Sequence, residues 1–595
     1  MIKDPDRIKG IPYGVGSYEE IKERNLYYVD KTDFLKKIET AGSYLVFIRP
    51  RRFGKTLLIS MMETYYDVDK AGQFDTYFFG TAVFKQPTLE RNSYLILKFD
   101  FSQIKSSVDQ VEASFFNHVV NQANIFISKY HRLLDVEPKK TMAELAAKKN
   151  APDLLSSLLS LCRIADRHIY VIIDEYDNFA NTILSTAGTS PYEDLTHGEG
   201  FFKEFFKVIK SGTSGSDIPV KRLFITGVSP ITLDDVTSGF NIGENISIDS
   251  AFNEMMGFRE AEVIEMIDYY SKAGKLSHQP QHLLQVMSRW YNHYRFSREA
   301  RGGIFNPTLV LYFLKEYSKN QKIPDELFDE NVRIDYAKLR HLVLVDKGGA
   351  AKINGNFSRL QAIVENGFVT SRLQKSFQLR HLERTENFIS LLFYFGLLTI
   401  GGVDAEREDK VILKIPNEAI KKLFYEYIRE VYLETEVFSL DHEKYSEKLE
   451  NMAYRGEWQP FFEYFAQRMK AGSSLRDLIS GEKFIHGFLA AYLGWSDLYL
   501  IRSEEELNKG YADLVLQPFL AKYEKMRFTY IIEIKYMKSA ESKNKQRLEQ
   551  LKKKAEEQLK KYSLDENLKK SIGNTTSIKL VLVFAGHELL YMAEV

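Results

Sequence analysis

The sequence predicts a multidomain α/β protein that begins with a parallel sheet covered by helices. Its 595 residues exceed the roughly 250–300 that a single hydrophobic core can organise, so about two to four domains are expected. A hydrophobic content of 44% and a charged content of 27% are typical of globular chains and exclude a disordered or collagen-like protein. In the first third, apolar runs alternate with helical stretches, which is the order of a parallel sheet.

The predicted sheet has four short strands, and they lie at residues 44–48, 94–100, 169–174 and 222–226. Their side chains are mostly apolar without a break, as in strands that are buried on both faces. Helical stretches, including residues 57–66 and 201–210, separate the strands along the chain. The short connections and the alternation predict helices on both faces of one sheet.

The turn after the first strand has the composition of a phosphate-binding loop. It reads RPRRFGKT, from Arg49 to Thr56. Gly54 lets the main chain approach a phosphate, Lys55 can reach the β and γ phosphates, and the Thr56 hydroxyl can hold Mg²⁺. Arg49 stands where the full pattern has glycine, so an ordinary basic turn between strand and helix is the alternative.

A pair of carboxylates after the third strand supplies the second half of a nucleotide site. Asp174 would bind Mg²⁺ through water, and Glu175 would orient the attacking water. The alternative is a solvated acidic turn, which is less common for two adjacent carboxylates. Thr226, at the end of the fourth strand, can sense the γ-phosphate or merely cap the turn. The candidate nucleotide-binding residues are therefore Arg49, Pro50, Arg51, Arg52, Phe53, Gly54, Lys55, Thr56, Asp174 and Thr226, with Glu175 as the catalytic residue.

Five segments of the chain form a recognisable set: YVDKTDFL (28–35), RPRRFGKT (49–56), IIDEYD (172–177), ITGVSP (225–230) and WYNHYRF (290–296). With these segments the chain resembles the bacterial AAA-ATPase-like proteins that carry a PD-(D/E)XK nuclease-like domain at the C-terminus. The resemblance covers nearly the whole chain and implies an additional-strand P-loop fold that binds ATP. It also implies that Arg49 is a trait of the family. It does not locate an arginine finger, for which Arg51, Arg52, Arg222 and Arg259 are candidates.

The middle of the chain is predicted to be a helical connector over residues 251–430. Amphipathic stretches at 260–273 and 307–317 predict helices, and Pro307 suits a helix start. A helix at 388–395, followed by strands at 397–400 and 410–415, suggests a winged-helix element, which would serve as an ATPase lid or contact DNA. The uncharged stretch 388–403 is shorter than the roughly 20 residues of a membrane span, so it is interpreted as core. The charged N-terminus lacks a secretory signal, and a cytoplasmic protein is expected.

The last quarter contains carboxylates in the pattern of a metal-dependent phosphodiesterase. Such a site needs two or three carboxylates around a hard cation. Asp513 and Glu533 would bind the metal together with the Ile534 carbonyl, and Glu482 would bind it through water. Lys535 lies on the same face of the strand as Glu533 and can position the attacking water. The alternative is ordinary surface pairing, because Glu and Lys are common partners on a sheet face.

Two residues on the following helix complete the predicted catalytic set. Gln558 and Tyr562 have the Q-x-x-x-Y spacing of one helical turn and would brace the site or touch the substrate backbone. The order of elements resembles the PD-(D/E)XK nuclease fold, and Gln558 with Tyr562 resembles its RecB-like branch. Mg²⁺ and Mn²⁺ both suit a site of oxygen ligands. A fold that keeps these residues without cutting is the remaining alternative.

Charge gives modest support for a nucleic-acid partner, with DNA as the first expectation. The 81 Lys and Arg residues cancel the 81 Asp and Glu residues, so any attraction must be local. Residues 521–570 contain 15 basic and 8 acidic side chains, a net charge of +7 by subtraction. The alternative is a solvated amphipathic helix, since Glu–Lys pairs are expected on such a surface.

The sequence therefore predicts three domains: an AAA-ATPase-like P-loop domain over 1–250, a helical and winged-helix connector over 251–430, and a PD-(D/E)XK nuclease-like domain over 431–595. The predicted function is ATP hydrolysis coupled to metal-dependent DNA cleavage, which the resemblance places in defence or DNA repair. The alternative is a nucleotide-gated switch or sensor whose C-terminal domain binds nucleic acid or protein without cutting. A weaker alternative is a DNA motor that assembles as a homo-oligomeric ring.

Overall fold

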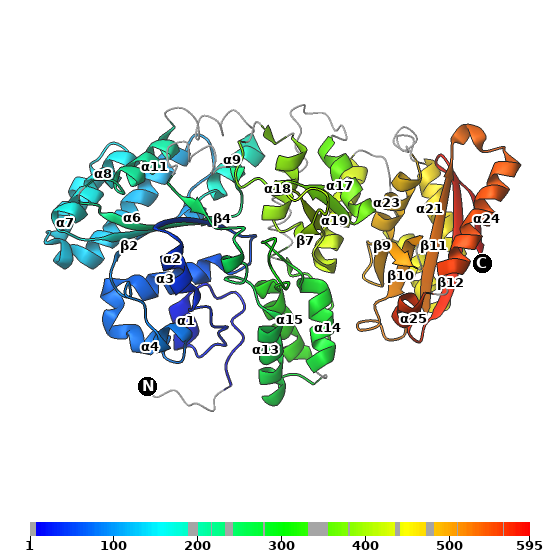
Figure 1. The fold of residues 1–595 in the computed structure, drawn as a ribbon, viewed down its shortest axis with the longest axis horizontal. Coiled ribbons are helices and arrows are strands. Elements are labelled where there is room, and N and C mark those ends of the chain that lie inside the picture. Colours follow the sequence, from blue (N-terminus) through cyan, green and yellow to red (C-terminus); the bar gives the residue numbers. More distant parts are fainter. Residues whose placement is uncertain are drawn as a thin grey trace. The chain divides into compact units, whose positions relative to one another are not determined.

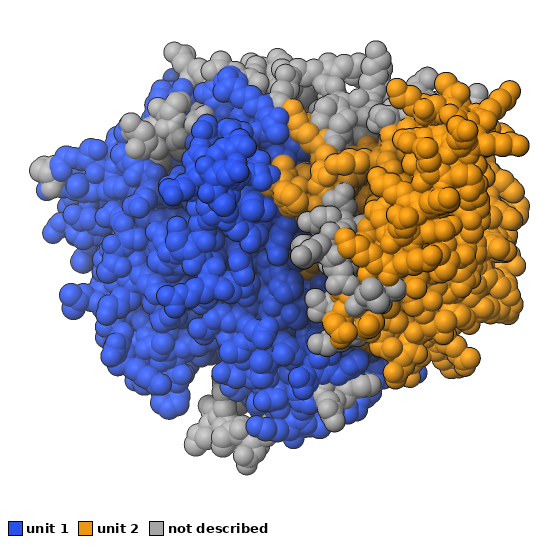
Figure 2. Space-filling view, turned by 45° about the vertical axis from the view of Figure 1, so that its right-hand side comes forward, with its two compact units in different colours: residues 1–345, 370–416 blue, residues 346–369, 417–595 orange. Residues whose placement is uncertain are grey.

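The computed structural model describes residues 8–187, 200–215, 217–231, 242–277, 280–330, 332, 355–378, 381–382, 384–434, 441–471, 481–507, 510–562 and 565–595. The chain divides into two compact units (Figure 2). Unit 1 contains residues 1–345 and 370–416, and unit 2 contains residues 346–369 and 417–595.

The first sheet of unit 1 has the strand order β2-β3-β4-β1-β5. Each of its neighbouring pairs is parallel. The strands are β1 (Tyr44–Ile48), β2 (Leu95–Asp100), β3 (Ile169–Asp174), β4 (Val220–Gly227) and β5 (Glu244–Asn245). Because β4 lies between β1 and β3, the sheet has the additional strand that was expected. The four predicted strands are confirmed with small shifts at their ends, whereas β5, only two residues long, was not predicted.

Helices cover both faces of this sheet (Figure 1). One face carries α6 (Val111–Leu134), α8 (Ala151–Ile164) and α11 (Phe201–Ser211), and the other carries α3 (Lys55–Tyr66). Helix α8 illustrates how the sequence sets such an element: Asn150 caps its first turn, and a stripe of leucines is buried. The remaining helices of this region are α1 (Tyr18–Glu23), α2 (Phe34–Ala41), α4 (Phe74–Phe78), α5 (Ala82–Lys85), α7 (Pro138–Ala146) and α9 (Asn178–Ala187).

The rest of unit 1 is a helical group followed by a small sheet. Its helices are α13 (Glu260–Lys272), α14 (Pro280–Tyr291), α15 (Pro307–Asn320) and α18 (Thr385–Tyr394). The sheet has the order β6-β8-β7, with β6 (Phe368–Ser371), β7 (Thr399–Val403) and β8 (Val411–Lys414). The expected helix and antiparallel hairpin are therefore present as α18, β7 and β8. No helix in the described part of the chain is long and apolar enough to cross a membrane.

Unit 2 is built on the sheet β13-β12-β11-β10-β9. Its strands are β9 (Tyr499–Leu507), β10 (Gly510–Pro518), β11 (Phe528–Met537), β12 (Thr576–Ala585) and β13 (Glu588–Glu594). Strands β11 and β12 are parallel, and the other pairs are antiparallel. The helices are α17 (Gly355–Asn366), α19 (Glu418–Glu434), α20 (His442–Arg455), α21 (Gln459–Ala471), α23 (Glu482–Leu493), α24 (Lys545–Tyr562) and α25 (Glu566–Ile572). The order α23, β9–β11, α24, β12 is the predicted order of the nuclease fold.

The predicted connector, residues 251–430, contributes to both compact units. Helices α13, α14, α15 and α18 group with unit 1, whereas α17 and α19 group with unit 2. The domain boundaries at 250 and 430 remain predictions.

Candidate functional site

The loop between β1 and α3 has the main-chain shape of a phosphate-binding turn. Gly54 has a φ of 94°, a left-handed conformation that favours glycine, and α3 begins at Lys55. The Lys55 ammonium donates to the carbonyl oxygens of Arg49 at 3.2 Å and Pro50 at 3.1 Å. Burial lowers the pKa of Lys55, against the negative charges of Glu175 and Asp174. The first residues of α3, including this lysine, line one cavity, as anion binding at a helix N-terminus requires.

Arg49 has a structural role at the start of the loop. Its side chain is 1% exposed and lies 4.1 Å from the ring of Phe47 and 4.3 Å from the ring of Phe296. Its guanidinium donates to the carbonyl oxygens of Ser247 at 2.6 Å and Phe252 at 3.1 Å. These contacts fasten the start of the loop to the core, and a contact of Arg49 with nucleotide stays a prediction.

A cavity of about 700 Å³ opens beside the loop, a volume within the usual range for small-molecule sites. Every loop residue from Arg51 to Thr56 lines it, together with Asp174 and Glu175. Pro50 does not line it and instead supplies the carbonyl that holds Lys55. The predicted phosphate loop and the predicted acidic pair therefore meet at one cavity.

Asp174 and Thr56 meet directly, although 118 positions separate them in the sequence. The Thr56 hydroxyl donates to Asp174 Oδ2 at 3.0 Å, and the Glu175 amide donates to Asp174 Oδ1 at 2.9 Å. Burial raises the pKa of Asp174 to about 6; the charges of Glu175 and Asp100 add to this, and Lys55 opposes it. A hydroxyl beside a partly desolvated carboxylate is the donor set that Mg²⁺ accepts next to nucleotide phosphates.

Two polar residues of this site were missed by the sequence analysis. Asp100 pairs in register with Asp174 across β2 and β3, and it lines the same cavity. Asn178 also lines the cavity and accepts a hydrogen bond from Arg51 at 3.3 Å. The signal for Asp100 was present in the sequence, since carboxyl ends of parallel strands share one edge of a sheet.

The last acid of the IDEYD segment has a structural role. Asp177 is 1% exposed, and its carboxylate accepts from the amides of Val228 at 3.2 Å and Ser229 at 2.6 Å. It thereby holds the turn that follows β4. Thr226, in that strand, is fully buried, does not line the cavity and has a hydroxyl without a hydrogen-bond partner among the described residues. Its role as a γ-phosphate sensor stays a prediction.

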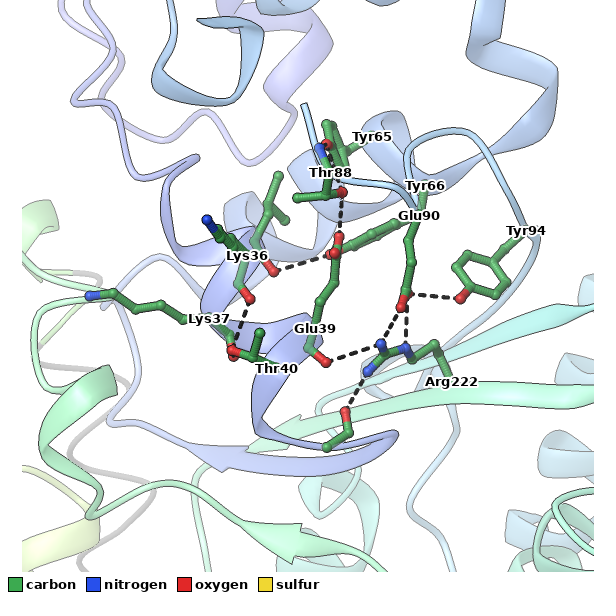
Figure 3. A network of polar contacts seen from close by, with 12 residues as sticks. Lys36, Lys37, Glu39, Thr40, Tyr65, Tyr66, Thr88, Glu90, Tyr94 and Arg222 are labelled. Atoms are coloured by element: carbon green, nitrogen blue, oxygen red, sulfur yellow. Dashed lines mark hydrogen bonds and ion pairs between the residues drawn. The ribbon is translucent and has the colours of Figure 1, made fainter. Parts of the chain in front are cut away.

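The structure narrows the candidates for an arginine finger. Arg222 lies toward the amino end of β4, away from the phosphate loop, in a network with Glu90, Glu39 and Tyr94 (Figure 3). Both Glu90 carboxylate oxygens and the Glu39 carbonyl accept from its guanidinium. Arg259 pairs with Glu262 at 2.8 Å at the start of α13. Among the four candidates, Arg51 and Arg52 line the cavity.

In unit 2, the residues of the predicted nuclease site converge. The Lys535 ammonium lies 2.6 Å from Glu533 Oε1, and it lies 4.0 Å from both Asp513 Oδ2 and Glu482 Oε1. It also donates to the Ile534 carbonyl at 3.0 Å. The Ile534 amide donates to Asp513 Oδ2 at 2.7 Å, which ties β10 to β11 at the site. Three carboxylates from α23, β10 and β11 therefore surround one lysine.

The electrostatics of this cluster reflect the burial of its charges. Burial raises the pKa of Glu533 to about 8, helped by the charge of Asp513 and opposed by Lys535. For Lys535, burial is outweighed by the negative charges of Glu533 and Asp513, and its pKa is raised. Burial also raises the pKa of Glu482. The raised pKa values show that negative charge on these carboxylates is unfavourable in the site as it stands. A bound divalent cation would neutralise that charge, so the site is suited to one.

Glu533 also provides a test of whether the site fits a metal. Its Oε2 atom is buried without a hydrogen-bond partner in the described structure. In the described ranges, no three His, Cys, Asp or Glu side chains are grouped as a metal-binding set. The oxygen atoms available to bind a metal are therefore the carboxylates of Asp513 and Glu533 and the main-chain carbonyl of Ile534. Glu482 would bind the metal only through water. These are hard oxygen ligands, and they fit Mg²⁺ or Mn²⁺.

Gln558 and Tyr562 lie beside the site on α24. Gln558 Nε2 donates to the Tyr562 hydroxyl at 3.1 Å, and the Tyr562 ring belongs to the core under the helix. Burial raises the pKa of Tyr562, and the charge of Glu533 adds to this effect. Tyr562 is therefore positioned by packing, and Gln558 is held by Tyr562 at the rim of the carboxylate cluster.

His486 is a further residue of this site to which the sequence analysis gave no function. It lies on α23 one turn after Glu482 and is 5% exposed. Its Nε2 atom is 2.6 Å from the main-chain carbonyl of Asp513, so it donates there as the Nε2–H tautomer. The signal in the sequence was the spacing of four residues from Glu482, which places both side chains on one face of a helix.

The comparison with protein families agrees with this architecture. Residues 12–237 match the family model described as predicted AAA-ATPase, and residues 480–594 match that of the PD-(D/E)XK nuclease superfamily. The chain therefore contains an AAA-ATPase-like domain followed by a C-terminal PD-(D/E)XK nuclease superfamily domain.

One relative is a protein of Azotobacter chroococcum mcd 1 described as the uncharacterized protein in the vnfD 5' region. It is 26% identical over 309 residues, which are 52% of this chain and 52% of the relative. The chain thus spans about half the length of this relative.

Two solved structures of the Aeropyrum pernix ORC2 protein also match. The chain in ADPNP-ADP complexes is 13% identical and has a TM-score of 0.30, and the match covers 73% of this chain and 97% of that chain. The ADP form is 12% identical and has a TM-score of 0.26, with 72% and 97% covered. With TM-scores this low, neither adds to the argument for the fold.

Proposed function

We propose that this protein is an ATP-dependent nuclease that hydrolyses ATP in unit 1 and cuts nucleic acid, with DNA as the first candidate, in unit 2. The observation that carries the proposal is the position of Lys535, within 4.0 Å of the carboxylates of Glu482, Asp513 and Glu533. A surface Glu–Lys pair would be exposed, whereas Glu533 is 0% exposed and Lys535 is 5% exposed. A buried Glu–Lys pair beside two further carboxylates costs stability, and a functional reason for keeping it is expected.

In the ATPase site, each residue would act through groups that already face the cavity. Lys55 would leave the carbonyls of Arg49 and Pro50 and bind the β and γ phosphates, and the N-terminus of α3 would stabilise their charge. A bound Mg²⁺ would neutralise developing charge on the phosphates. Thr56 and Asp174 would hold it, and Glu175 would orient the attacking water.

In the nuclease site, Asp513, Glu533 and the Ile534 carbonyl would hold a divalent metal, Mg²⁺ or Mn²⁺. When bound, that ion would lower the pKa of a water molecule and so supply a nucleophile near neutral pH. Lys535, released from its ion pair with Glu533, would position this water. Gln558, together with Tyr562, would support the substrate backbone.

A second candidate function, a nucleotide-gated switch that binds nucleic acid or protein without cutting, is favoured by one observation. Lys535 lies 2.6 Å from Glu533 Oε1 and donates to the Ile534 carbonyl at 3.0 Å, so contacts between its own groups close the site. Such a site needs metal or substrate to open it.

The wider setting follows from the family resemblance and is part of the proposal. We assign the protein to the cytoplasm and to defence against mobile DNA or DNA repair. A homo-oligomer would allow Arg51 or Arg52 of one copy to reach a neighbouring site, as arginine fingers do in trans.

The test is incubation of the purified protein with linear, circular and single-stranded DNA and with RNA, with and without ATP and Mg²⁺. Lys55→Ala should abolish phosphate release, and Asp513→Ala should abolish cleavage. The matched controls are Lys85→Ala and Glu557→Ala, which remove exposed side chains. Equal cleavage by the unchanged protein and Asp513→Ala would refute the nuclease. ATP turnover without cleavage under every condition would favour the switch.

A further inference from the structure

The two edges of helix α24 have different surroundings. Its buried face contains Leu551, Ala555, Leu559 and Tyr562. On one edge, Lys552 pairs with Glu549 at 2.7 Å, and its ammonium lies 4.1 Å from the ring centroid of Tyr591. Tyr591 belongs to β13, at one end of the sheet, so this edge of the helix faces β13.

The opposite edge of α24 contains Arg547, Lys554 and Gln558. At 3.6 residues per turn, these three positions fall within about 40° of one another around the helix axis. Gln558 bonds to Tyr562 beside the carboxylate cluster. Because β10 and β13 lie on opposite sides of β11 and β12, this second edge faces the strand that carries Asp513.

Electrostatics independently place Lys554 near the carboxylates. Its positive charge is among those that act on Glu482, lowering the pKa that burial raises. Lys554 is exposed, and its ammonium makes no hydrogen bond or ion pair within the described ranges. The guanidinium of Arg547 is likewise exposed and unpaired among those residues. By contrast, Lys552 on the other edge has partners from the chain itself. Arg547 and Lys554, two cations on the edge of α24 that leads to the acidic site, therefore have no acceptor among the described residues.

We propose that Arg547, Lys554 and Gln558 form a contact row for the phosphate backbone of a polynucleotide whose scissile bond lies at the carboxylate cluster. The inference rests on the proposed nuclease function and deepens it. Lys and Arg bind backbone phosphates without reading sequence, and an amide can donate to a phosphate oxygen. Arg547 and Lys554 are seven residues apart, ~10.5 Å along the helix axis. A row of that length suits several successive phosphates of one strand better than a single mononucleotide.

The positive charges of the row would also offset the repulsion between the carboxylate cluster and a polynucleotide. Three carboxylates repel a polyanion, and Lys535 is already paired with one of them. Cations on an edge that approaches the cluster would hold the strand in register until a metal neutralises the carboxylates. The row is predicted to contribute to binding affinity and to its salt dependence, independently of cleavage.

The experiment measures the binding of fluorescently labelled DNA and RNA oligonucleotides to the full-length protein by anisotropy, with EDTA present so that the probe stays intact. The test variant is Lys554→Ala, and the matched control is Lys553→Ala. Lys553 is the neighbouring residue, is exposed and unpaired among the described residues, and points away from the row by about 100°. Both variants remove one positive charge from the same helix, so a general charge effect cancels.

Lys554→Ala is expected to reduce the slope of log affinity against log salt concentration by about one. At about 0.1 M salt the variant should then bind about tenfold more weakly than the unchanged protein, whereas at about 1 M salt the two should bind alike. Lys553→Ala is expected to leave the slope unchanged. If the two variants differ in their binding of DNA alone, or of RNA alone, that nucleic acid is the one that the row binds. Equal affinities and slopes for the two variants would overturn the contact row and leave the nuclease proposal standing. Absence of any binding by the unchanged protein would also overturn the contact row, whereas the nuclease proposal is decided by the cleavage test with Mg²⁺.

Discussion

Single charged side chains at both sites are held by main-chain groups as well as by opposite charges. Lys55 donates to two carbonyls of its own loop, and Asp513 accepts from the amide of Ile534. Asp174 accepts from the amide of Glu175, whose φ of 52° is a left-handed conformation that non-glycine residues rarely adopt. Strain of this kind concentrates at functional sites. The left-handed conformation of Glu175 places its amide where it can hold the Asp174 carboxylate, and it lowers the stability of the fold.

The first prediction concerns Asp174. Its pKa of about 6 lies above the value of 3.8 for a free aspartate, so the folded protein binds this proton more readily than the unfolded chain. The stability that protonation contributes is complete below pH 3.8 and is lost as pH rises through about 6. Asp174→Asn, which keeps an oxygen for Thr56, should therefore be more stable than the unchanged protein above pH 6, by up to ~3 kcal/mol.

The measurement is Tm without nucleotide between pH 4 and 8. The advantage of Asp174→Asn should shrink as pH falls below about 6, and the variant should hydrolyse no ATP because an amide is a poor Mg²⁺ ligand. The exposed Asp75→Asn is the control. A constant Tm difference across this pH range would contradict the prediction.

At the scale of elements, the loop from Arg49 to Thr56 combines an anchored end and a functional end. Arg49 is bonded to carbonyls in the core, while Arg51 lines the cavity. A similar division occurs after β3, where Asp174 faces the cavity and Asp177 holds the turn after β4. A methyl group on Gly227, the last residue of β4, would lie 2.4 Å from Asp177 Oδ1, so only glycine fits there.

The second prediction separates the two ends of this loop by substituting each arginine. Arg49→Met should destabilise unit 1 by on the order of 3 kcal/mol, because it leaves the buried Ser247 carbonyl without this donor and the Phe252 carbonyl with the Met255 amide alone. Arg51→Met should leave Tm nearly unchanged and weaken ATP binding. Thermal unfolding and nucleotide titration of both variants measure these effects. Loss of ATP affinity in Arg49→Met at unchanged Tm would show that Arg49 contacts the ligand after all.

At the scale of the whole molecule, the chain passes between the two units three times, after residues 345, 369 and 416. Helix α17 therefore belongs to unit 2, although it precedes β7 and β8 of unit 1 in the sequence. It approaches α23 closely: a methyl group on Gly487 would lie 2.9 Å from the Glu365 side chain. Leu360, Ile363 and Val364 of α17 are buried. The helix that carries Glu482 is thus packed against a segment far from the nuclease-family match.

The third prediction follows from this packing. The fragment 417–595, which lacks α17, should unfold more easily than the same fragment with residues 355–369 attached through a Gly/Ser linker. Burial of three aliphatic side chains is worth ~1.5–3 kcal/mol each, so a difference of at least ~4.5 kcal/mol is expected. Denaturant unfolding of both fragments measures it. Equal midpoints and slopes would mean that α17 does not stabilise the nuclease unit.

Much of the fold could be predicted from the sequence because its signals are local. The strands of the first sheet are continuous apolar runs, and the loop RPRRFGKT is recognisable by residue type and spacing. The order of Glu482, Asp513, Glu533 and Lys535, followed by Gln558 and Tyr562, predicted that these side chains would converge in unit 2, and a nuclease activity there stays a proposal. Asp100 and His486 each had a local signal in the sequence, but their contacts come from partners distant in sequence: Asp174 across the sheet, and the Asp513 carbonyl across the helix–sheet interface.

The sequence by itself determined which residue types are available and which strand or helix holds each, because hydrophobic periodicity and turn chemistry act over a few neighbouring residues. The tertiary structure alone decided which way those side chains face. Arg49 and Arg222 are basic residues near a nucleotide site in the sequence, yet both are locked into structural networks. In the sequence, nothing distinguishes Lys554 from other surface lysines. In the structure, it lies on the edge of α24 that faces Glu482. Burial and direction depend on contacts between distant segments, and no local pattern specifies them.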